Sequence, residues 1–162
     1  MLCISTKGRY ATRILTLLAS QTPDTTFTKQ AIAASEELAP GYVQQLLTQL
    51  QAAGLVMSYR GKQGGFKLAR SPESITVAEA LRVMEGEIKL APCHDGEDCH
   101  RVAVCPTRTM WIEAAVVFED FFRQTTIADL AERAKVIACA TDPTAIAVDA
   151  APARAEEKGV RA

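Results

Sequence analysis

Three cysteines recur at equal intervals near the middle of the chain. Cys93, Cys99 and Cys105 each lie six positions apart, in a segment (91–106) with proline near both ends and glycine inside it. Such a loop lets three thiolates converge on one point. Structural zinc sites usually pair cysteines about two to four residues apart, so the wider gaps favour wrapping an iron–sulfur cluster. The alternatives are a zinc site of soft sulfur ligands and three unrelated cysteines.

The remaining sulfur and imidazole groups leave the fourth ligand undecided. His94 and His100 are the chain's two histidines, and both lie in the cysteine loop. Either could be a fourth ligand, although a loop histidine is as often simply solvated. Cys3 is expected in a strand or in the core, and Cys139 is expected to be incidental to the tail.

A second set of residues could read DNA. The segment 40–53 places four apolar side chains at helical spacing, which predicts the buried face of a helix. Its opposite face is polar and almost free of acids, as a helix entering a major groove requires. Glutamine can pair with adenine, whereas tyrosine and threonine can reach phosphates or a thymine methyl group; a merely solvated face is the alternative. The candidate DNA-binding residues on this face are Tyr42, Gln44, Gln45 and Thr48.

A basic, glycine-rich hairpin follows that helix. The turn RGKQGG separates two short apolar runs, LVMSY and FKLA, which predict paired strands. Arg60, Gly61 and Lys62 at its tip are candidate contacts to the phosphate backbone or the minor groove, and Lys67 and Arg70 lie beside it. A flexible hairpin is the alternative. A nucleotide-binding P-loop is disfavoured because the spacing of its glycines and lysine is absent.

The surrounding elements predict a mainly α fold with a small β-hairpin wing. Two short helices, a tight turn and a hairpin form a winged helix-turn-helix. Ser5 and Thr28 can cap helices, and Thr126 with Asp129 resembles a capping box. The expected helices span 6–20, 29–35, 40–53, 76–85 and 107–123, with one more short helix after Thr126.

Charge and composition divide the chain into three parts. Residues 1–70, the expected winged helix-turn-helix domain, carry eight Lys and Arg against three acids, whereas residues 71–162 carry ten against sixteen. The basic half suits a polyanionic partner. Residues 71–137 are expected to hold the cysteine loop and the helices of a dimer interface. From 138 to 162 the chain is alanine-rich, with two prolines and no aromatic residue, and a disordered tail is expected.

The long helix 107–123 carries an apolar stripe, Trp111, Ala115, Phe118 and Phe122. It is the best candidate for the seam of a homodimer, because so small a domain has little other core for these aromatic residues. An ordinary core helix is the alternative.

Several protein classes are excluded or disfavoured. No apolar run is long enough to span a membrane, and the N-terminus lacks the apolar segment of a secretory signal, so a cytoplasmic location is expected. An oxidoreductase or zinc enzyme fares poorly, because the chain has no CxxC pair, no HExxH motif and no Ser/His/Asp set. The protein is therefore not expected to be an enzyme.

These motifs together resemble the IscR/NsrR/RirA-type winged-helix regulators of bacteria. The resemblance covers roughly residues 1–135, through STKGRYA, QLQAAGLV, RGKQGGFKLA, the evenly spaced cysteines and TIADL. It implies a homodimeric cytosolic DNA-binding repressor or activator. Many members hold an iron–sulfur cluster on the three-cysteine loop and sense iron, cluster status, nitric oxide or redox state.

The resemblance also implies roles for individual residues. Cys93, Cys99 and Cys105 match the cluster ligands; Tyr42, Gln44 and Gln45 fall on the recognition helix, and Arg60 and Gly61 on the wing. One branch of the family has a histidine ligand where this chain has Arg108, and another has an acid near the start of the first helix, where Gly8 and Arg9 stand. Because of these departures, the sequence does not decide whether the cluster is [2Fe–2S] or [4Fe–4S]. A cluster-free regulator that senses thiol oxidation is the alternative.

Overall fold

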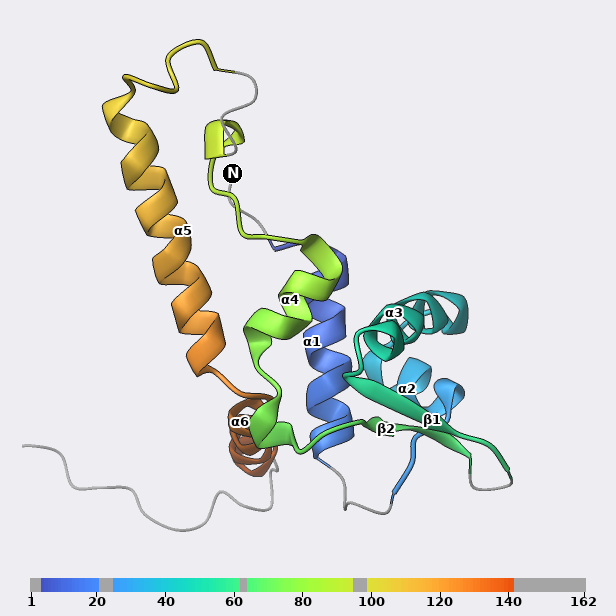
Figure 1. Cartoon of the computed structure of the whole chain (residues 1–162). Coiled ribbons are helices and arrows are strands. Elements are labelled where there is room, and N and C mark those ends of the chain that lie inside the picture. The colour runs from blue at the N-terminus through green and yellow to red at the C-terminus, as the bar shows by residue number, and fades with distance from the viewer. Residues whose placement is uncertain (1–3, 21–24, 62–63, 95–98, 142–162) are drawn as a thin grey trace, which may run out of the picture.

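The computed structural model describes residues 4–20, 25–61, 64–94 and 99–141, and it is mostly helical with one two-stranded hairpin (Figure 1). The fold class expected from the sequence is confirmed. Lys62, Cys3, the loop residues 95–98 and residues 142–162 lie outside the described residues. The elements are α1 (Thr6–Ala19), α2 (Lys29–Glu36), α3 (Pro40–Ala52), β1 (Val56–Tyr59), β2 (Gly65–Leu68), η1 (Pro72–Ser74), α4 (Val77–Glu85), η2 (Pro92–His94), α5 (Pro106–Gln124) and α6 (Ile127–Thr141).

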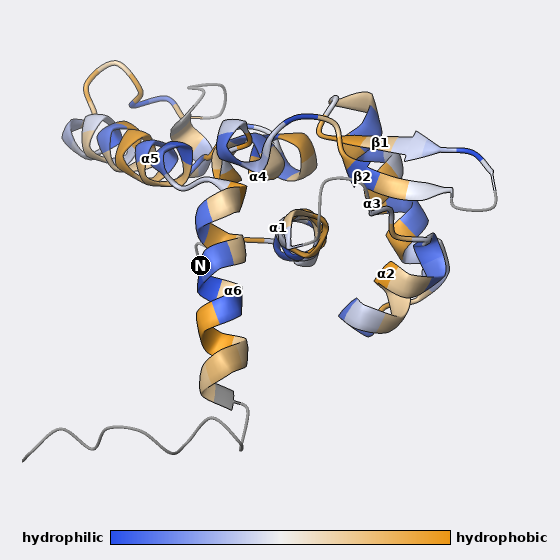
Figure 2. Cartoon of the chain, turned by 90° about the horizontal axis from the view of Figure 1, so that it is seen from below, coloured by the Kyte–Doolittle hydropathy of each residue, from blue (hydrophilic) through white to orange (hydrophobic). Residues whose placement is uncertain are grey.

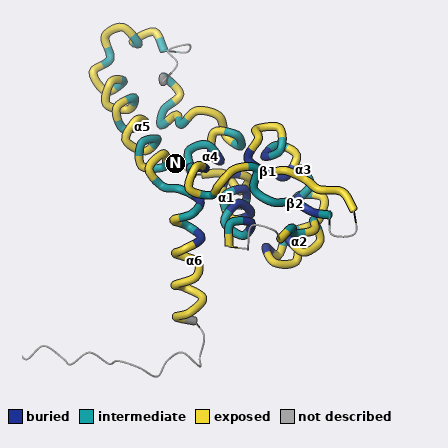
Figure 3. The backbone as a smooth tube through the Cα atoms, turned by 60° about the horizontal axis from the view of Figure 1, so that its bottom comes forward, coloured by how far each residue is buried: buried dark blue, intermediate teal, exposed yellow. Residues whose placement is uncertain are grey.

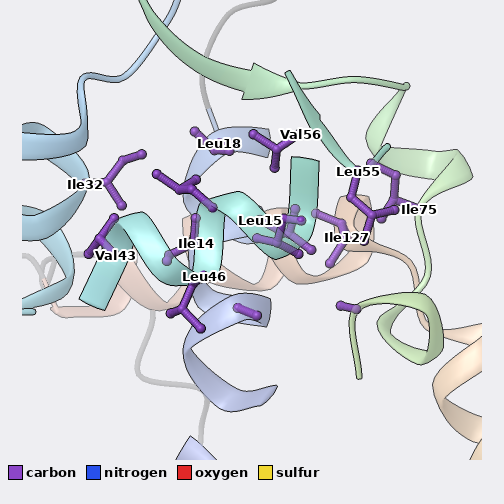
Figure 4. Packing of buried hydrophobic residues seen from close by; sticks show 14 of the residues in the cluster. Ile14, Leu15, Leu18, Ile32, Val43, Leu46, Leu55, Val56, Ile75 and Ile127 are labelled. Atoms are coloured by element: carbon purple, nitrogen blue, oxygen red, sulfur yellow. The ribbon is translucent and has the colours of Figure 1, made fainter. Parts of the chain in front are cut away.

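Helix α1 runs through the centre of the packed part of the molecule (Figure 1). Its residues Ile14 and Leu15 are fully buried, and apolar side chains of α2, α3, α4 and β1 close around them (Figure 4). Ile75 and Ile127 belong to the same cluster. The core therefore runs across the expected boundary after residue 70 and includes a residue from the start of α6.

Local capping explains where the early helices begin. The hydroxyl groups of Ser5 and Thr28 accept hydrogen bonds from backbone N–H groups three residues on, at the starts of α1 and α2. Pro40 occupies the first turn of α3, where its missing N–H costs nothing. These starts agree with the sequence analysis. Between α2 and α3, Glu37 adopts a left-handed φ of 56°.

The wing is an antiparallel hairpin in which Val56 pairs with Leu68 and Tyr59 with Gly65. Phe27, just before α2, adds a β-bridge to Phe66. A side chain on Gly65 would lie 2.5 Å from the carbonyl oxygen of Phe27, so this approach of two backbones requires glycine. Gly61 at the tip has a φ of 117°, which also favours glycine. The bridge was not foreseen, because it joins residues about forty positions apart.

Backbone hydrogen bonds join the starts of α4 and α6. Thr76 and Thr126 form a β-bridge, the N–H of Val77 donates to the carbonyl of Thr125 (2.9 Å), and the N–H of Ile127 donates to the carbonyl of Ile75 (2.8 Å). Each helix opens with a reciprocal capping contact, Thr76 with Glu79 and Thr126 with Asp129. The second contact confirms the capping box expected from the sequence.

Helices α5 and α6 project from the packed body and are exposed over most of their surfaces (Figures 1 and 3). The helix after Thr126 was expected to be short, but α6 has 15 residues. It includes residues 138–141, which the composition predicts to belong to a disordered tail. Alanine has the highest helix propensity, so the alanine-rich composition there is compatible with continuing the helix. Within the described residues, no helix combines the length and apolar character needed to cross a membrane.

Candidate nucleic-acid interface and cysteine loop

Helix α3 has the two faces that the sequence predicts. Val43, Leu46, Leu47 and Leu50 are fully buried. Gln45 and Thr48 are exposed, whereas Tyr42 and Gln44 are half-buried. The four candidate DNA-binding residues of α3 therefore differ in how much of each side chain is available to a partner.

Three of these four side chains are already engaged within the protein. The hydroxyl of Thr48 donates to the carbonyl of Gln44 (2.8 Å), and the Gln44 amide lies 3.4 Å from the same hydroxyl. The ring of Tyr42 meets that of Tyr10 from α1 edge to face, at 6.2 Å. Gln45 has no hydrogen-bond partner within the described part of the chain and projects into solvent. Gln45 is therefore the side chain of this face most available for pairing with a base edge.

The wing carries basic residues in two different situations. Arg60 and Gly61 are exposed at the tip, and Lys62 lies outside the described residues. The ammonium group of Lys67 lies 4.6 Å from the centre of the Tyr59 ring, which restricts its position without neutralising its charge. Arg70 turns away from the tip and pairs with Glu79 of α4 at 2.8 Å. Of these described basic residues, Arg70 alone is paired with an acid.

The environment of Glu79 shows how firmly this contact is held. Burial acts to raise the pKa of Glu79, but hydrogen bonds from the Arg70 side chain and the Thr76 backbone, together with the Arg70 charge, outweigh it. The pKa of the carboxyl consequently lies below its ordinary value. The sequence near Arg70 gives no sign of this ion pair, because the partner Glu79 lies in α4.

The cysteine loop is joined to the first turn of α5. The three cysteines are half-buried. The Nε of Arg108 donates to the carbonyl oxygen of Cys93 at 3.1 Å, and η2 packs against α5. Arg108 stands where one branch of the resembled family has a histidine ligand, and here its side chain binds the loop backbone. Cys99 accepts a backbone hydrogen bond from Val102.

Cys105 occupies the position directly before α5. Its sulfur lies 3.3 Å from the hydroxyl of Thr107, and the pKa of the thiol is lowered by that hydroxyl and by backbone hydrogen bonds from Arg108 and Thr107, with a weaker attraction from Arg101. A stabilised thiolate is the form that binds metals and reacts with oxidants.

The chemistry of the donors suits an iron–sulfur cluster, but their placement is not that of a ready-made site. Among the described residues, no three His, Cys, Asp or Glu side chains come together in a group that could hold a metal ion. The acids nearest the loop centre, Asp95, Glu97 and Asp98, lie outside the described range, and His100 is exposed. The expected fourth ligand therefore stays a prediction.

The apolar stripe expected on α5 is partly packed against the rest of the chain and partly exposed to solvent. Ala115 is buried and Phe122 packs against the core, whereas Trp111 and Phe118 are exposed. The stripe is therefore only partly covered within this chain. Near the body, Arg82 of α4 pairs with Glu119 of α5. Other apolar side chains exposed on this helix are Met110, Val116, Val117 and Phe121. Figure 2 shows apolar and polar residues in alternating bands along α5.

Comparisons with known proteins match nearly the whole described chain. A family model described as "Rrf2: Iron-dependent Transcriptional regulator" matches residues 4–133. The HTH-type transcriptional regulator CymR of Bacillus subtilis (strain 168) is 34% identical over 128 residues, which cover 79% of this chain and 88% of that regulator.

Solved structures of two such regulators are also similar to this chain. The structure of CymR (YrzC), described as the global cysteine regulator of B. subtilis, superposes with a TM-score of 0.70 at 35% identity, covering 82% of this chain and 98% of that one. The structure of T. potens IscR superposes with a TM-score of 0.69 at 32% identity, covering 84% and 90%.

Proposed function

The chain belongs to the Rrf2 family of transcriptional regulators, a non-enzymatic family, and on that premise we propose that it is a homodimer that binds an operator in double-stranded DNA. The observation that carries this proposal is the pairing of a polar, exposed face on α3 with a basic wing tip that follows it in the chain. We place the protein in the cytoplasm, where its DNA partner lies.

The two elements would make different kinds of contact. Gln45 reaches a base edge in the major groove and can pair with adenine through its amide. Gln44 and Thr48 act as one hydrogen-bonded unit beside it. Arg60 and Gly61, with Lys62 between the wing strands, follow the phosphate backbone or enter the minor groove. Tyr42 supplies a contact to a phosphate or to a thymine methyl group.

A second copy of the chain would cover α5. Monomeric proteins rarely leave contiguous apolar patches of large side chains in water, and Trp111, Val117 and Phe118 are all exposed on this helix. Pairing two α5 helices brings two DNA-reading halves into one symmetric molecule. Such a dimer reads two half-sites about 34 Å apart, one turn of the duplex.

For the signal, we propose that Cys93, Cys99 and Cys105 hold an iron–sulfur cluster, [2Fe–2S] or [4Fe–4S], whose state reports iron, redox conditions or nitric oxide. Support comes from the thiol spacing, from the stabilised Cys105 thiolate and from the family's description as iron-dependent. When bound, a cluster supplies redox and ligand-exchange chemistry. The loop would have to rearrange to gather the three thiols.

The alternative input is oxidation of the thiols without a metal. It is favoured by the lowered pKa of the half-buried Cys105 thiol, and by the likeness to CymR, which is described as the global cysteine regulator of B. subtilis. In either case the signal enters where the loop backbone meets α5, through the contact between Arg108 and Cys93.

One experiment tests both inputs and the DNA-binding function. The chain is purified without oxygen, its iron, sulfide and visible spectrum are measured, and it is titrated against duplexes selected from a random-sequence pool before and after exposure to air. We expect iron and a visible absorption band, abolished by Cys93→Ala, Cys99→Ala or Cys105→Ala but kept in Cys139→Ala. A colourless protein whose DNA affinity still responds to oxidation would favour thiol sensing. Failure to select any duplex would contradict the DNA-binding proposal.

A further inference from the structure

Glu36, at the end of α2, is the one charged residue that is buried within the described part of the chain, with only 8% of its side chain exposed. Its Oε2 lies 2.6 Å from the Nε of Arg13 on α1. The N–H is not directed at the oxygen in hydrogen-bond geometry. Arg13 itself is 55% exposed. A buried carboxylate at the C-terminal end of a helix is unfavourable both for its desolvation and for the helix dipole.

Arg13 connects this acid to the recognition helix. Its guanidinium lies 5.4 Å from the centre of the Tyr10 ring, and that ring meets the edge of the Tyr42 ring at 6.2 Å with an interplanar angle of 87°. A continuous row of contacts, here called the Glu36–Tyr42 row, therefore crosses α2, α1 and the first turn of α3.

The row begins beside the turn that sets the direction of α3. Glu37 follows Glu36 and adopts a left-handed backbone conformation that usually requires glycine. The N–H of Leu38 donates back to the carbonyl of Ala33 at 2.9 Å and closes the end of α2. A turn strained in this way persists only where neighbouring contacts hold it.

We propose that Arg13 and Glu36 are positioning residues for DNA reading, which hold the turn between α2 and α3 and, through Tyr10, orient Tyr42 at the start of α3. The inference rests on the proposed DNA-binding function. A buried ion pair is a poor source of stability compared with apolar side chains of similar volume. A role in the geometry of the recognition helix explains why a charged pair occupies this place.

The test separates stability from DNA reading. The double variant Arg13→Met/Glu36→Leu replaces the ion pair with apolar side chains that can still pack against Tyr10. The probe is the duplex that the wild type selects from a random-sequence pool, together with single-base variants of it and an unrelated duplex of equal length. The measurements are the melting temperature of the protein and its affinity for each duplex.

We expect the double variant to melt at the same temperature as the wild type or above it. Its affinity for the selected duplex should fall about tenfold, equivalent to about 1.4 kcal/mol, while its affinity for the unrelated duplex stays the same. The single variant Arg13→Lys, which retains the positive charge, should lose less affinity for the selected duplex than the double variant. The matched control is Lys135→Met/Glu132→Leu, which removes an exposed ion pair of the same length from α6 and should change neither affinity.

Each contrary result has a distinct meaning. A double variant that binds the selected duplex like the wild type overturns the inference alone. A wild type that selects no duplex overturns the inference together with the DNA-binding proposal. If the double variant does not fold, Tyr10→Leu decides, because it leaves the ion pair and breaks the link to Tyr42. Unchanged discrimination among the single-base variants in Tyr10→Leu would then overturn the inference.

Discussion

The DNA-reading half of this molecule (α1 to β2) and the projecting half (α5 and α6) differ in how their apolar side chains are covered. Around α1, side chains such as Ile14 and Leu47 are fully buried inside one chain. Along α5, Ala115 is the one buried residue, and large apolar side chains face solvent. The contrast is visible along the backbone (Figure 3). The apolar side chains of the first half are covered within one chain, whereas several large apolar side chains of α5 are not.

This difference also separates the two functional regions. Gln45 and Arg60 are carried by elements packed on a filled core. The cysteines lie on a loop that is anchored by the contact of Arg108 with Cys93 and by the start of α5. A DNA-reading region on a packed core, joined through a helix to a separate cysteine loop, is compatible with a regulator in which a signal at one place alters the structure at another.

The largest expected effect tests the packed half directly. Leu50→Ala removes a fully buried side chain of α3 and should lower the free energy of unfolding by about 2–5 kcal/mol. Val117→Ala, on the exposed surface of α5, should change it by less than about 0.5 kcal/mol at concentrations where the chain is monomeric. Chemical denaturation measures both. Equal losses for the two variants would remove the distinction between the halves.

The next prediction concerns the exposed surface of α5. Phe118→Glu places a charge in the expected dimer seam, and loss of a central aromatic contact costs about 2 kcal/mol or more. The dissociation constant of the dimer should rise at least about 30-fold, as measured by analytical ultracentrifugation. Glu113→Gln on the same helix is the control and should leave it unchanged. A monomeric wild type would show that α5 does not pair in this way.

Within the reading half, the two glutamines of α3 should differ. Gln45 is unpaired within the described residues, whereas Gln44 is held by Thr48. Gln45→Ala should reduce discrimination at one base pair by about 1–3 kcal/mol. Gln44→Ala should have the smaller effect, since its amide would have to leave Thr48 to reach a base. Affinities for single-base variants of the selected duplex decide this, and the opposite ranking would assign base reading to Gln44.

The wing gives a similar comparison between a free and a paired cation. Arg60→Ala should reduce the slope of log affinity against log salt by about 1, as expected for one lost phosphate contact. Arg70→Ala should leave that slope unchanged, because Arg70 pairs with Glu79 rather than projecting from the tip. A reduced slope in Arg70→Ala would place this residue at the DNA instead.

The smallest effect is a dependence of stability on pH at the same contact. Because the pKa of Glu79 is lowered in the folded protein, its ionised carboxylate stabilises the fold above the ordinary value of about 4.5 and this contribution is lost as the pH falls through the folded value. The melting temperature of the wild type should therefore be higher than that of Glu79→Gln at neutral pH, and the two melting temperatures should converge in acid. A constant difference at all pH values would show that the charge of Glu79 contributes nothing.

Features set by neighbours in the sequence were predicted well. The caps at Ser5, Thr28 and Thr126 and the proline at the start of α3 depend on residues within one helical turn, and the structure confirms them. The buried face of α3 follows from the spacing of its leucines in the same local way.

Contacts between distant residues were missed for the opposite reason. Nothing in the sequence near Arg70 indicates Glu79, and nothing near Arg13 indicates Glu36, because each pair depends on how whole helices pack. The length of α6 was underestimated since alanine-rich segments occur both in helices and in tails. The roles of the cysteines and of the DNA-binding residues remain predictions.

The place of Ile127 has a consequence for how the protein folds during its synthesis. This residue is completely buried in the core around α1, and its N–H bonds to Ile75. A ribosome adds about 5–20 residues per second, so the nascent DNA-reading half waits several seconds for the residue that completes its core. During that interval its apolar surface is open to chaperones. A fragment cut before residue 127 would stay in that unfinished condition, and the reading half should not fold fully when expressed alone.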